Sequence, residues 1–105
     1  NLNFSSRVFM ITGKQRAQLK RLSHGMKPLM QIGKNGITPG VIEQIDHLLE
    51  DHELVKIALL QNTAVELNEA AATLTDALGA EFVQGIGSKL TLYRPAKEDP
   101  VIVLE

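Results

Sequence analysis

The sequence contains no cysteine and no tryptophan, and its aromatic residues are three phenylalanines and one tyrosine. Without cysteine the chain forms neither disulfide bonds nor thiolate metal sites, which agrees with a reducing compartment, so we expect a cytoplasmic protein. No apolar run approaches the roughly 20 residues that a helix needs to cross a bilayer, and no membrane partner is expected. So few aromatic side chains also fall short of the interleaved platform on which single-strand binders stack bases.

Acidic residues are missing from positions 1–42, although the whole chain has a formal net charge of −1. That stretch carries seven lysines and arginines, whereas nine acidic residues and the single base Lys56 lie between Glu43 and Glu81. The sign reverses again between Phe82 and Lys97, where every charged residue is basic. Charges sorted in this way can gather on two faces, so a near-neutral protein can still hold a polyanion. Nucleic acid is therefore a candidate partner.

The 105 residues suit one folded domain with a single hydrophobic core. No repeat, linker or low-complexity tract interrupts residues 11–95. We expect residues 1–9 to be a non-native or disordered leader, residues 10–97 to be the folded domain and residues 98–105 to be a C-terminal tail. Pro95 is expected to close the ordered part. One domain without a long exposed apolar stretch indicates a monomer.

Capping signals predict three helices. Each begins at a threonine whose hydroxyl can accept a hydrogen bond from the first helical turn, and apolar residues follow at helical spacing. Two of the threonines precede a glutamine or glutamate by three positions, which is the capping-box pattern, and one precedes a proline. The expected starts are Thr12 with Gln15, Thr38 with Pro39, and Thr63 with Glu66.

Apolar runs bounded by glycine or proline predict four strands, and a Gly87-Ser88-Lys89 turn separates the last two. The second strand is almost continuously apolar and is expected to be buried on both faces. The resulting order, α-β-α-β-α-β-β, predicts an α/β fold with a four-stranded mixed sheet. The expected strands are Pro28 to Ile32, Leu54 to Leu60, Glu81 to Ile86 and Leu90 to Arg94.

A loop of four residues, Gly33, Lys34, Asn35 and Gly36, joins the first expected strand to the second expected helix. The first turn of a helix leaves N–H groups unpaired and carries partial positive charge, so phosphate fits there. Glycine lets the backbone approach an anion closely, Lys34 adds a mobile charge, and Asn35 tolerates left-handed backbone. The same GxxG spacing clamps backbone nucleotides in KH domains. We expect RNA phosphate to bind here, and a turn that merely requires glycine is the alternative.

Basic residues of the first expected helix lie directly upstream of this loop. A solvated helix face usually mixes charges of both signs, so the absence of acidic partners favours contact with RNA. Two basic residues near the last strands join the set, although a lysine in a hairpin can also protect a sheet edge. The expected RNA-binding residues outside the loop are Lys14, Arg16, Lys20, Arg21, Lys27, Lys89 and Arg94.

No catalytic set and no metal site is expected from the sequence. The histidines His24, His47 and His52 have no carboxylate at a spacing that completes a ligand set. Ser23 and His24 are neighbours on a helix, so their side chains diverge by about 100°. We therefore expect neither catalysis nor a cofactor.

Four segments of the chain resemble the CRM domain family, named for chloroplast RNA splicing and ribosome maturation. The resemblance, to the stand-alone bacterial YhbY type, implies a fold similar to the C-terminal domain of translation initiation factor 3. It also implies RNA binding and association with precursors of the large ribosomal subunit. The GxxG loop keeps both glycines, whereas Gly85 replaces an expected β-branched residue and predicts a loosened strand or a bulge. The segments are Leu19 to His24, Leu29 to Thr38, His52 to Ile57 and Val83 to Arg94, within a match from about Ile11 to Pro95.

The acidic second helix leaves a different kind of function open. Its outward residues from Glu43 to Asp51 could bind a basic ribosomal protein, in which case the basic face would serve solubility. The chain would then be a protein-interaction module.

Overall fold

The computed structural model describes residues 11–104, and the expected leader at residues 1–9 lies outside them. Within this range, three helices and four strands follow one another in the predicted order. None of these helices is long and apolar enough to span a bilayer. The elements are α1 Gly13–Ser23, β1 Met30–Ile32, α2 Pro39–His52, β2 Leu54–Leu59, α3 Leu67–Leu78, β3 Glu81–Ile86 and β4 Lys89–Tyr93.

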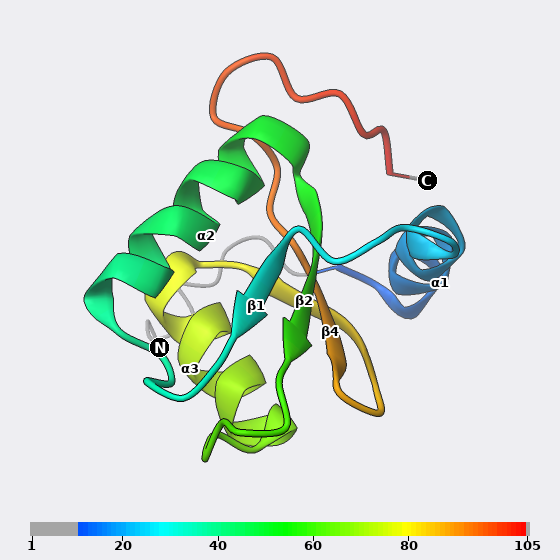
Figure 1. Ribbon diagram of the computed structural model, residues 1–105. Helices are drawn as coiled ribbons and strands as arrows, with labels where there is room; N and C mark the ends of the chain where they lie inside the picture. Colours follow the sequence, from blue (N-terminus) through cyan, green and yellow to red (C-terminus); the bar gives the residue numbers. More distant parts are fainter. Residues whose placement is uncertain (1–10, 105) are drawn as a thin grey trace, which may run out of the picture.

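The four strands form one mixed sheet in the order β1-β2-β4-β3, as predicted for the fold class. β1 runs parallel to β2, and β4 runs antiparallel to both of its neighbours (Figure 1). The parallel pair requires a crossover, which α2 provides. As a result, the chain leaves β1 and β2 at the same end of the sheet, and it turns from β3 into β4 at that end too.

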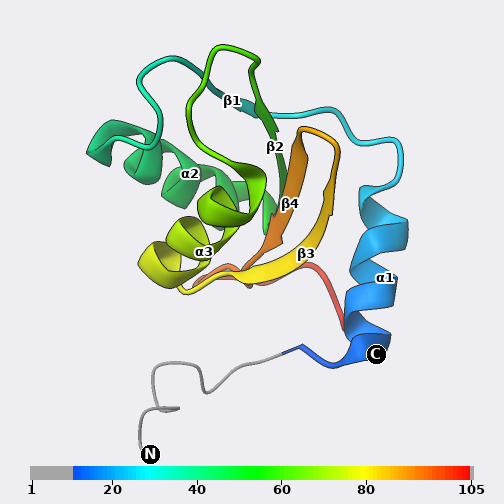
Figure 2. The same ribbon diagram turned by 90° about the horizontal axis from the view of Figure 1, so that it is seen from below.

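Helices cover the two faces of the sheet unequally. α2 and α3 pack on one face, and α1 lies alone on the other (Figure 2). The larger core joins Ile45 and Leu49 of α2 with Leu74 of α3, and with Ile57 and Leu90 of the sheet. Because successive strand residues point to opposite faces, the sheet can bury a second apolar set against α1.

A smaller core lies under α1, where Leu19 packs with Leu54 and Tyr93 of the sheet. Lys56, two residues from Leu54 and on the same face, donates from Nζ to the Ser23 carbonyl oxygen at 3.1 Å. That oxygen belongs to the last turn of α1, where carbonyls are unpaired and the helix dipole is negative. The single base of the acidic half of the sequence therefore anchors α1 to the sheet.

The first two predicted helix starts are confirmed. Thr12 Oγ1 accepts from Gln15 N at 3.1 Å, and Gln15 Oε1 accepts from Thr12 N at 2.9 Å, which completes the capping box of α1. Thr38 Oγ1 accepts from Val41 N at 3.2 Å, and Pro39 is the first residue of α2. Each hydroxyl satisfies an amide that the helix itself leaves unpaired.

The predicted capping box of α3 is wrong. The N-cap is Glu66, whose side chain makes no capping hydrogen bond, and the helix begins at Leu67. Thr63 Oγ1 instead accepts from Val65 N, two residues on, at 3.3 Å. Local side-chain-to-backbone bonds of this kind compete with helix capping, so the hydroxyl closes a bend before the helix begins.

Gly85 lies close to an irregularity in the sheet, as its departure from the family pattern predicted. The register between β3 and β4 shifts between Phe82 and Gln84. A Cβ atom on Gly85 would lie 2.8 Å from Leu67 Cδ2, closer than side chains normally approach. The glycine therefore leaves room for the first residue of α3 against the sheet.

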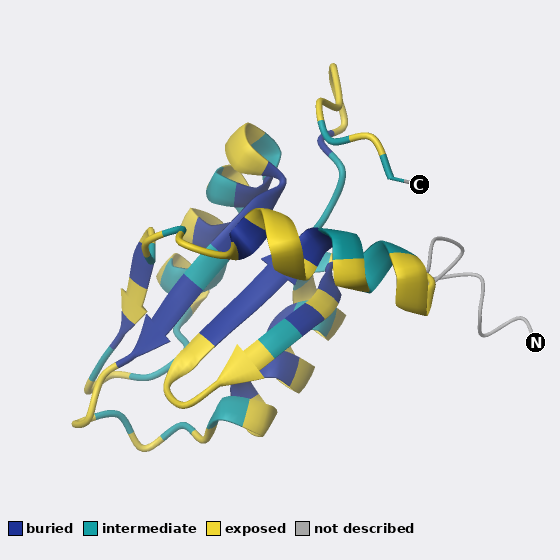
Figure 3. Ribbon diagram, turned by 90° about the vertical axis from the view of Figure 1, so that its right-hand side faces the viewer, coloured by how far each residue is buried: buried dark blue, intermediate teal, exposed yellow. Residues whose placement is uncertain are grey.

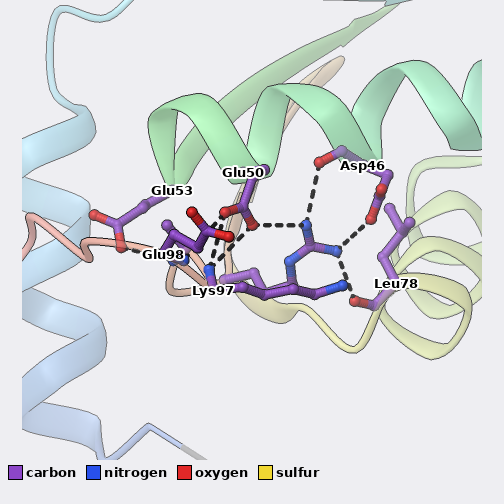
Figure 4. A network of polar contacts seen from close by, with 8 residues as sticks. Asp46, Glu50, Glu53, Leu78, Lys97 and Glu98 are labelled. Atoms are coloured by element: carbon purple, nitrogen blue, oxygen red, sulfur yellow. Dashed lines mark hydrogen bonds and ion pairs between the residues drawn. The ribbon is translucent and has the colours of Figure 1, made fainter.

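The chain stays fastened to the domain beyond Pro95, so the prediction that order ends there is wrong. Glu50, near the end of α2, accepts hydrogen bonds from the backbone N–H groups of Lys97 at 3.0 Å and Glu98 at 3.3 Å (Figure 4). Farther along, Gln18 Nε2 of α1 donates to the carbonyl oxygen of Val103 at 2.8 Å. The tail thus connects the end of α2 with α1.

Candidate nucleic-acid interface

Three loops gather at the end of the sheet where β1 and β2 finish (Figure 2). They are the GxxG loop after β1, the turn after β2 and the hairpin between β3 and β4. Two backbone bonds hold them together: Leu60 N donates to Ile32 O at 2.9 Å, and Leu59 N donates to Ser88 O at 2.8 Å. Figure 3 shows that the hairpin at this end is exposed. We call it the loop end.

The GxxG loop is a tight turn, closed by a hydrogen bond from Gly36 N to Gly33 O at 3.0 Å. Lys34 and Asn35 are exposed at its tip. Gly36 has a φ of +68°, a left-handed conformation that side chains other than glycine rarely adopt. A Cβ atom there would also lie 3.1 Å from Val65 Cγ2. The second glycine of the motif is therefore required by the turn itself.

Two consecutive amides at the tip of this turn are available to an anion. Within the described residues, no hydrogen bond engages the backbone N–H groups of Lys34 and Asn35. The start of α2 offers less than the sequence suggested, because Pro39 has no N–H and Thr38 Oγ1 already occupies the amide of Val41. The turn, more than the helix end, is therefore the feature that can hold a phosphate, with the Lys34 ammonium beside it.

α1 lies beside β3, and its second half faces the part of β3 that leads into the hairpin (Figure 2). Near the start of the helix, Arg16 Nε donates to the Phe82 carbonyl oxygen at 3.1 Å, so part of this guanidinium fastens α1 to β3. Lys20 and Arg21 are exposed and border a groove against the far half of β3. Lys14 is exposed in the first turn of α1, away from the loop end.

Lys89 lies between the GxxG loop and α1. It is the first residue of β4, is exposed, and pairs with Ala58 of β2 and Ile86 of β3. Its side chain projects on the same face as Tyr93, which packs under α1. Lys34 and Lys89 thus lie at the loop end, and Lys20 and Arg21 lie beside the part of β3 that leads into it.

The Arg94 side chain is mostly buried, and it lies away from the loop end. Its Nη1 contacts Asp46 Oδ1 at 2.7 Å and also donates to the Leu78 carbonyl oxygen at 3.2 Å (Figure 4). The side chain is only 11% exposed. The hydrogen bond from Arg94 lowers the pKa of the Asp46 carboxyl. Since β4 ends opposite Leu54, the first residue of β2, Arg94 is at the end of the sheet away from the loops.

Lys27 is exposed but also lies apart from the loop end. It lines a cleft of about 440 Å³ with His52, Leu54 and Ile102, at the end of the sheet where β2 begins. Of the predicted basic residues, Lys27 and Arg94 therefore fall outside the group that the structure brings together.

Sequence reasoning missed two residues that border the basic helix, Gln84 and Ile86 of β3. Gln84 is neutral and Ile86 is aliphatic, so a search of the sequence for basic residues identifies neither of them. Gly85 predicted an irregularity in this strand, but the place of the register shift, directly after Phe82, becomes visible only in the structure. Among residues 11–104, no group of three histidine, aspartate or glutamate side chains is placed to hold a metal ion.

These features define a three-layer α/β/α domain in which a glycine-flanked turn lies at one end of a mixed sheet and a basic helix lies beside an edge strand. Residues 11–94 match the CRS1/YhbY (CRM) domain family, and the chain belongs to that family. The resemblance read from the sequence is thereby confirmed.

Relatives from bacteria carry names that refer to RNA. The chain is 38% identical over 95 residues to the Bacillus subtilis "Probable RNA-binding protein YqeI", covering 90% of this chain and 99% of that protein. It is 34% identical over 88 residues to an "RNA-binding protein" of Haemophilus influenzae, covering 84% and 89%. The solution structure of SAV1595 from Staphylococcus aureus, described as a candidate RNA-binding protein, aligns with a TM-score of 0.77 and 46% identity. That alignment covers 91% of this chain and 100% of the other.

Proposed function

We propose that this chain binds RNA without catalysis and contacts the phosphate backbone at the loop end. The observation that carries the proposal is the turn at Lys34 and Asn35, whose two unengaged amides stand beside a lysine. Backbone amides and lysine side chains are common phosphate contacts in complexes with nucleic acids. The names of the relatives agree with RNA as the ligand.

The proposed interface extends from the turn to the exposed basic residues around it. Lys89 and the second half of α1 would contact neighbouring phosphates, and Lys14 and Arg16 would contact a longer RNA that follows the helix. Lys27 and Arg94 are left out because they lie at the other end of the sheet. The proposed contacts are therefore Gly33, Lys34, Asn35, Gly36, Lys20, Arg21 and Lys89, with Lys14 and Arg16 beyond them.

We further propose that the RNA belongs to the precursor of the large ribosomal subunit and that one copy of the chain binds it. The support is the membership of the CRM domain family, whose resemblance implied a role in ribosome maturation. Contacts to phosphates report the shape of a folded RNA, which suits a protein that recognises a stage of assembly.

The Lys34→Ala change is expected to weaken binding to every structured RNA by about fivefold and to reduce the slope of log affinity against log salt by about one unit. The physical reason is the loss of one phosphate contact and of the counterions that it releases. Binding to a ribosomal RNA fragment across a potassium chloride series measures both quantities.

Lys97→Ala is the matched control, because it removes the same charge from an exposed position on the tail. It should leave the slope unchanged. If Lys34→Ala kept both the affinity and the slope of the unaltered protein, the turn would not be a phosphate site.

A further inference from the structure

The groove between α1 and β3 offers a chemistry that differs from that of the GxxG turn. A hollow of about 450 Å³ is lined by Lys20, Arg21 and His24 of α1 and by Gln84 and Ile86 of β3. An adjoining hollow of about 550 Å³ shares three of these residues, Lys20, Gln84 and Ile86. No carboxylate lines either hollow in the part of the chain that the structure describes. The first hollow therefore combines positive charge with one amide and one aliphatic side chain, and the adjoining hollow adds Phe82 and Val83.

Gln84 and Ile86 project on the same face of the sheet, towards α1. They pair with Thr91 and Lys89, which are two residues apart in β4 and so share a face. Ile86 is 64% exposed, so its side chain is open to a ligand. Within residues 11–104, the side-chain amide of Gln84 makes no hydrogen bond. Both side chains are therefore available to contact a ligand that binds in the groove.

A nucleobase fits this combination better than a phosphate does. A glutamine amide offers both a donor and an acceptor, the pair of groups needed to read the edge of a base. The flat side of a base can rest on an aliphatic side chain, and the imidazole of His24 can stack on it. Lys20 and Arg21 at the rim would hold the phosphates that flank the base.

Only an unpaired nucleotide can enter such a groove. Bases inside an RNA duplex are stacked, and the major groove of A-form RNA is too narrow for side chains to read. A base in a bulge or a loop can instead turn outwards and reach the side chains between the helix and the strand. One groove of this size suits one such base.

We propose that the groove between α1 and β3 binds a single unpaired nucleotide of the RNA, with Gln84 reading the base edge and Ile86 supporting the base. This inference rests on the proposed function, and it adds base recognition to an interface that otherwise reads phosphates. Contacts to phosphates at the turn would orient the RNA on the protein. Recognition of the unpaired base would determine which site on the RNA the protein binds.

The test compares two RNA hairpins that are identical except for one bulged nucleotide. The unaltered protein should bind the bulged hairpin about tenfold more tightly, as expected for one good base contact. Gln84→Leu, which keeps the size of the side chain, should reduce this preference to nearly one. It should leave the salt slope unchanged, because no charge is lost.

Gln31→Leu is the control, since Gln31 is an exposed glutamine of β1 outside the groove and should keep the preference. A 2-aminopurine base at the bulge supplies a second readout, because its fluorescence should change on binding to the unaltered protein and to Gln31→Leu but not to Gln84→Leu.

Several results would overturn the inference, and they differ from failure of the proposed function. Salt-dependent binding of both hairpins with equal affinity would leave the phosphate interface standing and remove the base site. Absence of salt-dependent binding would remove both. Displacement of the bulged base by a free nucleoside monophosphate at micromolar concentration would assign the groove to a small molecule. Displacement by an acidic peptide, with Gln84→Leu still preferring the bulge, would assign it to a protein partner.

Discussion

Replacing Lys20, Arg21 and Lys34 together with alanine is expected to lower the affinity for structured RNA by about a hundredfold at moderate salt. The slope of log affinity against log salt should fall by about three units, close to one for each phosphate contact that is lost. The expectation depends on all three side chains facing one bound RNA. Lys20 and Arg21 lie beside the part of β3 that leads into the hairpin, and this hairpin and the GxxG turn of Lys34 both belong to the loop end.

The informative comparison is with charges removed from the other end of the sheet. Lys27→Ala combined with Lys97→Ala takes two lysines from exposed positions outside the interface and should leave the slope near that of the unaltered protein. A general loss of net charge would lower the slope in both variants in proportion to the number of lysines and arginines removed. Circular dichroism should show that the triple variant is folded, since all three side chains are exposed.

The sequence was sufficient where the signal is local. The capping residues of α1 and α2 lie within three positions of the amides that they bond, and the β3–β4 hairpin follows from the turn between its two strands. The turn at Gly36 also follows from a local requirement, because its left-handed backbone favours glycine. These features depend on neighbouring residues, so they can be read from the sequence before the fold is known.

The predictions that failed concern residues whose partners lie far away in the sequence. Arg94 looked like a free basic residue at the end of a strand, yet its partner Asp46 lies 48 positions away. The separation of the two charges along the sequence hides the pair that folding brings together. Likewise, the family pattern identifies Gly85 as unusual, but its reason is the side chain of Leu67 on a different element. Such partners depend on how helices cross the sheet.

The same pairing weakens the alternative in which acidic α2 binds a basic protein. Asp46 is engaged with Arg94, and Glu50 accepts hydrogen bonds from the backbone of the tail. Glu43 and Asp51 remain exposed on the helix. A charge reversal that included Asp46 would disturb the fold, so the discriminating variant is Glu43→Lys with Asp51→Lys. Unchanged or stronger RNA binding in this variant supports the interface at the loop end.

Loss of the Glu53 carboxylate should destabilise the domain. It is the C-cap of α2, is only 2% exposed, and has a φ of +66°. A left-handed backbone at a residue other than glycine costs roughly 1 kcal/mol or more. The structure retains a glutamate there for its carboxylate, which accepts backbone hydrogen bonds from Ala96, Val101 and Ile102 at 2.8 to 2.9 Å.

Glu53→Gln is expected to lower the free energy of unfolding by about 2 to 3 kcal/mol at neutral pH, because an amide cannot accept three bonds as strongly as a buried anion. Urea denaturation measures this change. Amide hydrogen exchange at Val101 and Ile102 should be faster in the variant, since their bonds hold the tail to the end of α2. Glu98→Gln, an exposed glutamate of the same tail, is the control and should change neither quantity.

The pH dependence supplies an independent check on the role of Glu53. Burial tends to raise the pKa of its carboxyl, but the three backbone hydrogen bonds outweigh burial and hold the pKa below its ordinary value of 4.5. A carboxyl whose pKa is lower in the folded state stabilises the fold above its unfolded pKa. That contribution is lost as the pH falls through the folded pKa. The difference in stability between the unaltered protein and Glu53→Gln should therefore be full above pH 4.5 and shrink below it. A difference that stayed constant into the acid range would mean that Glu53 acts through packing, and that the tail is held by its other contacts.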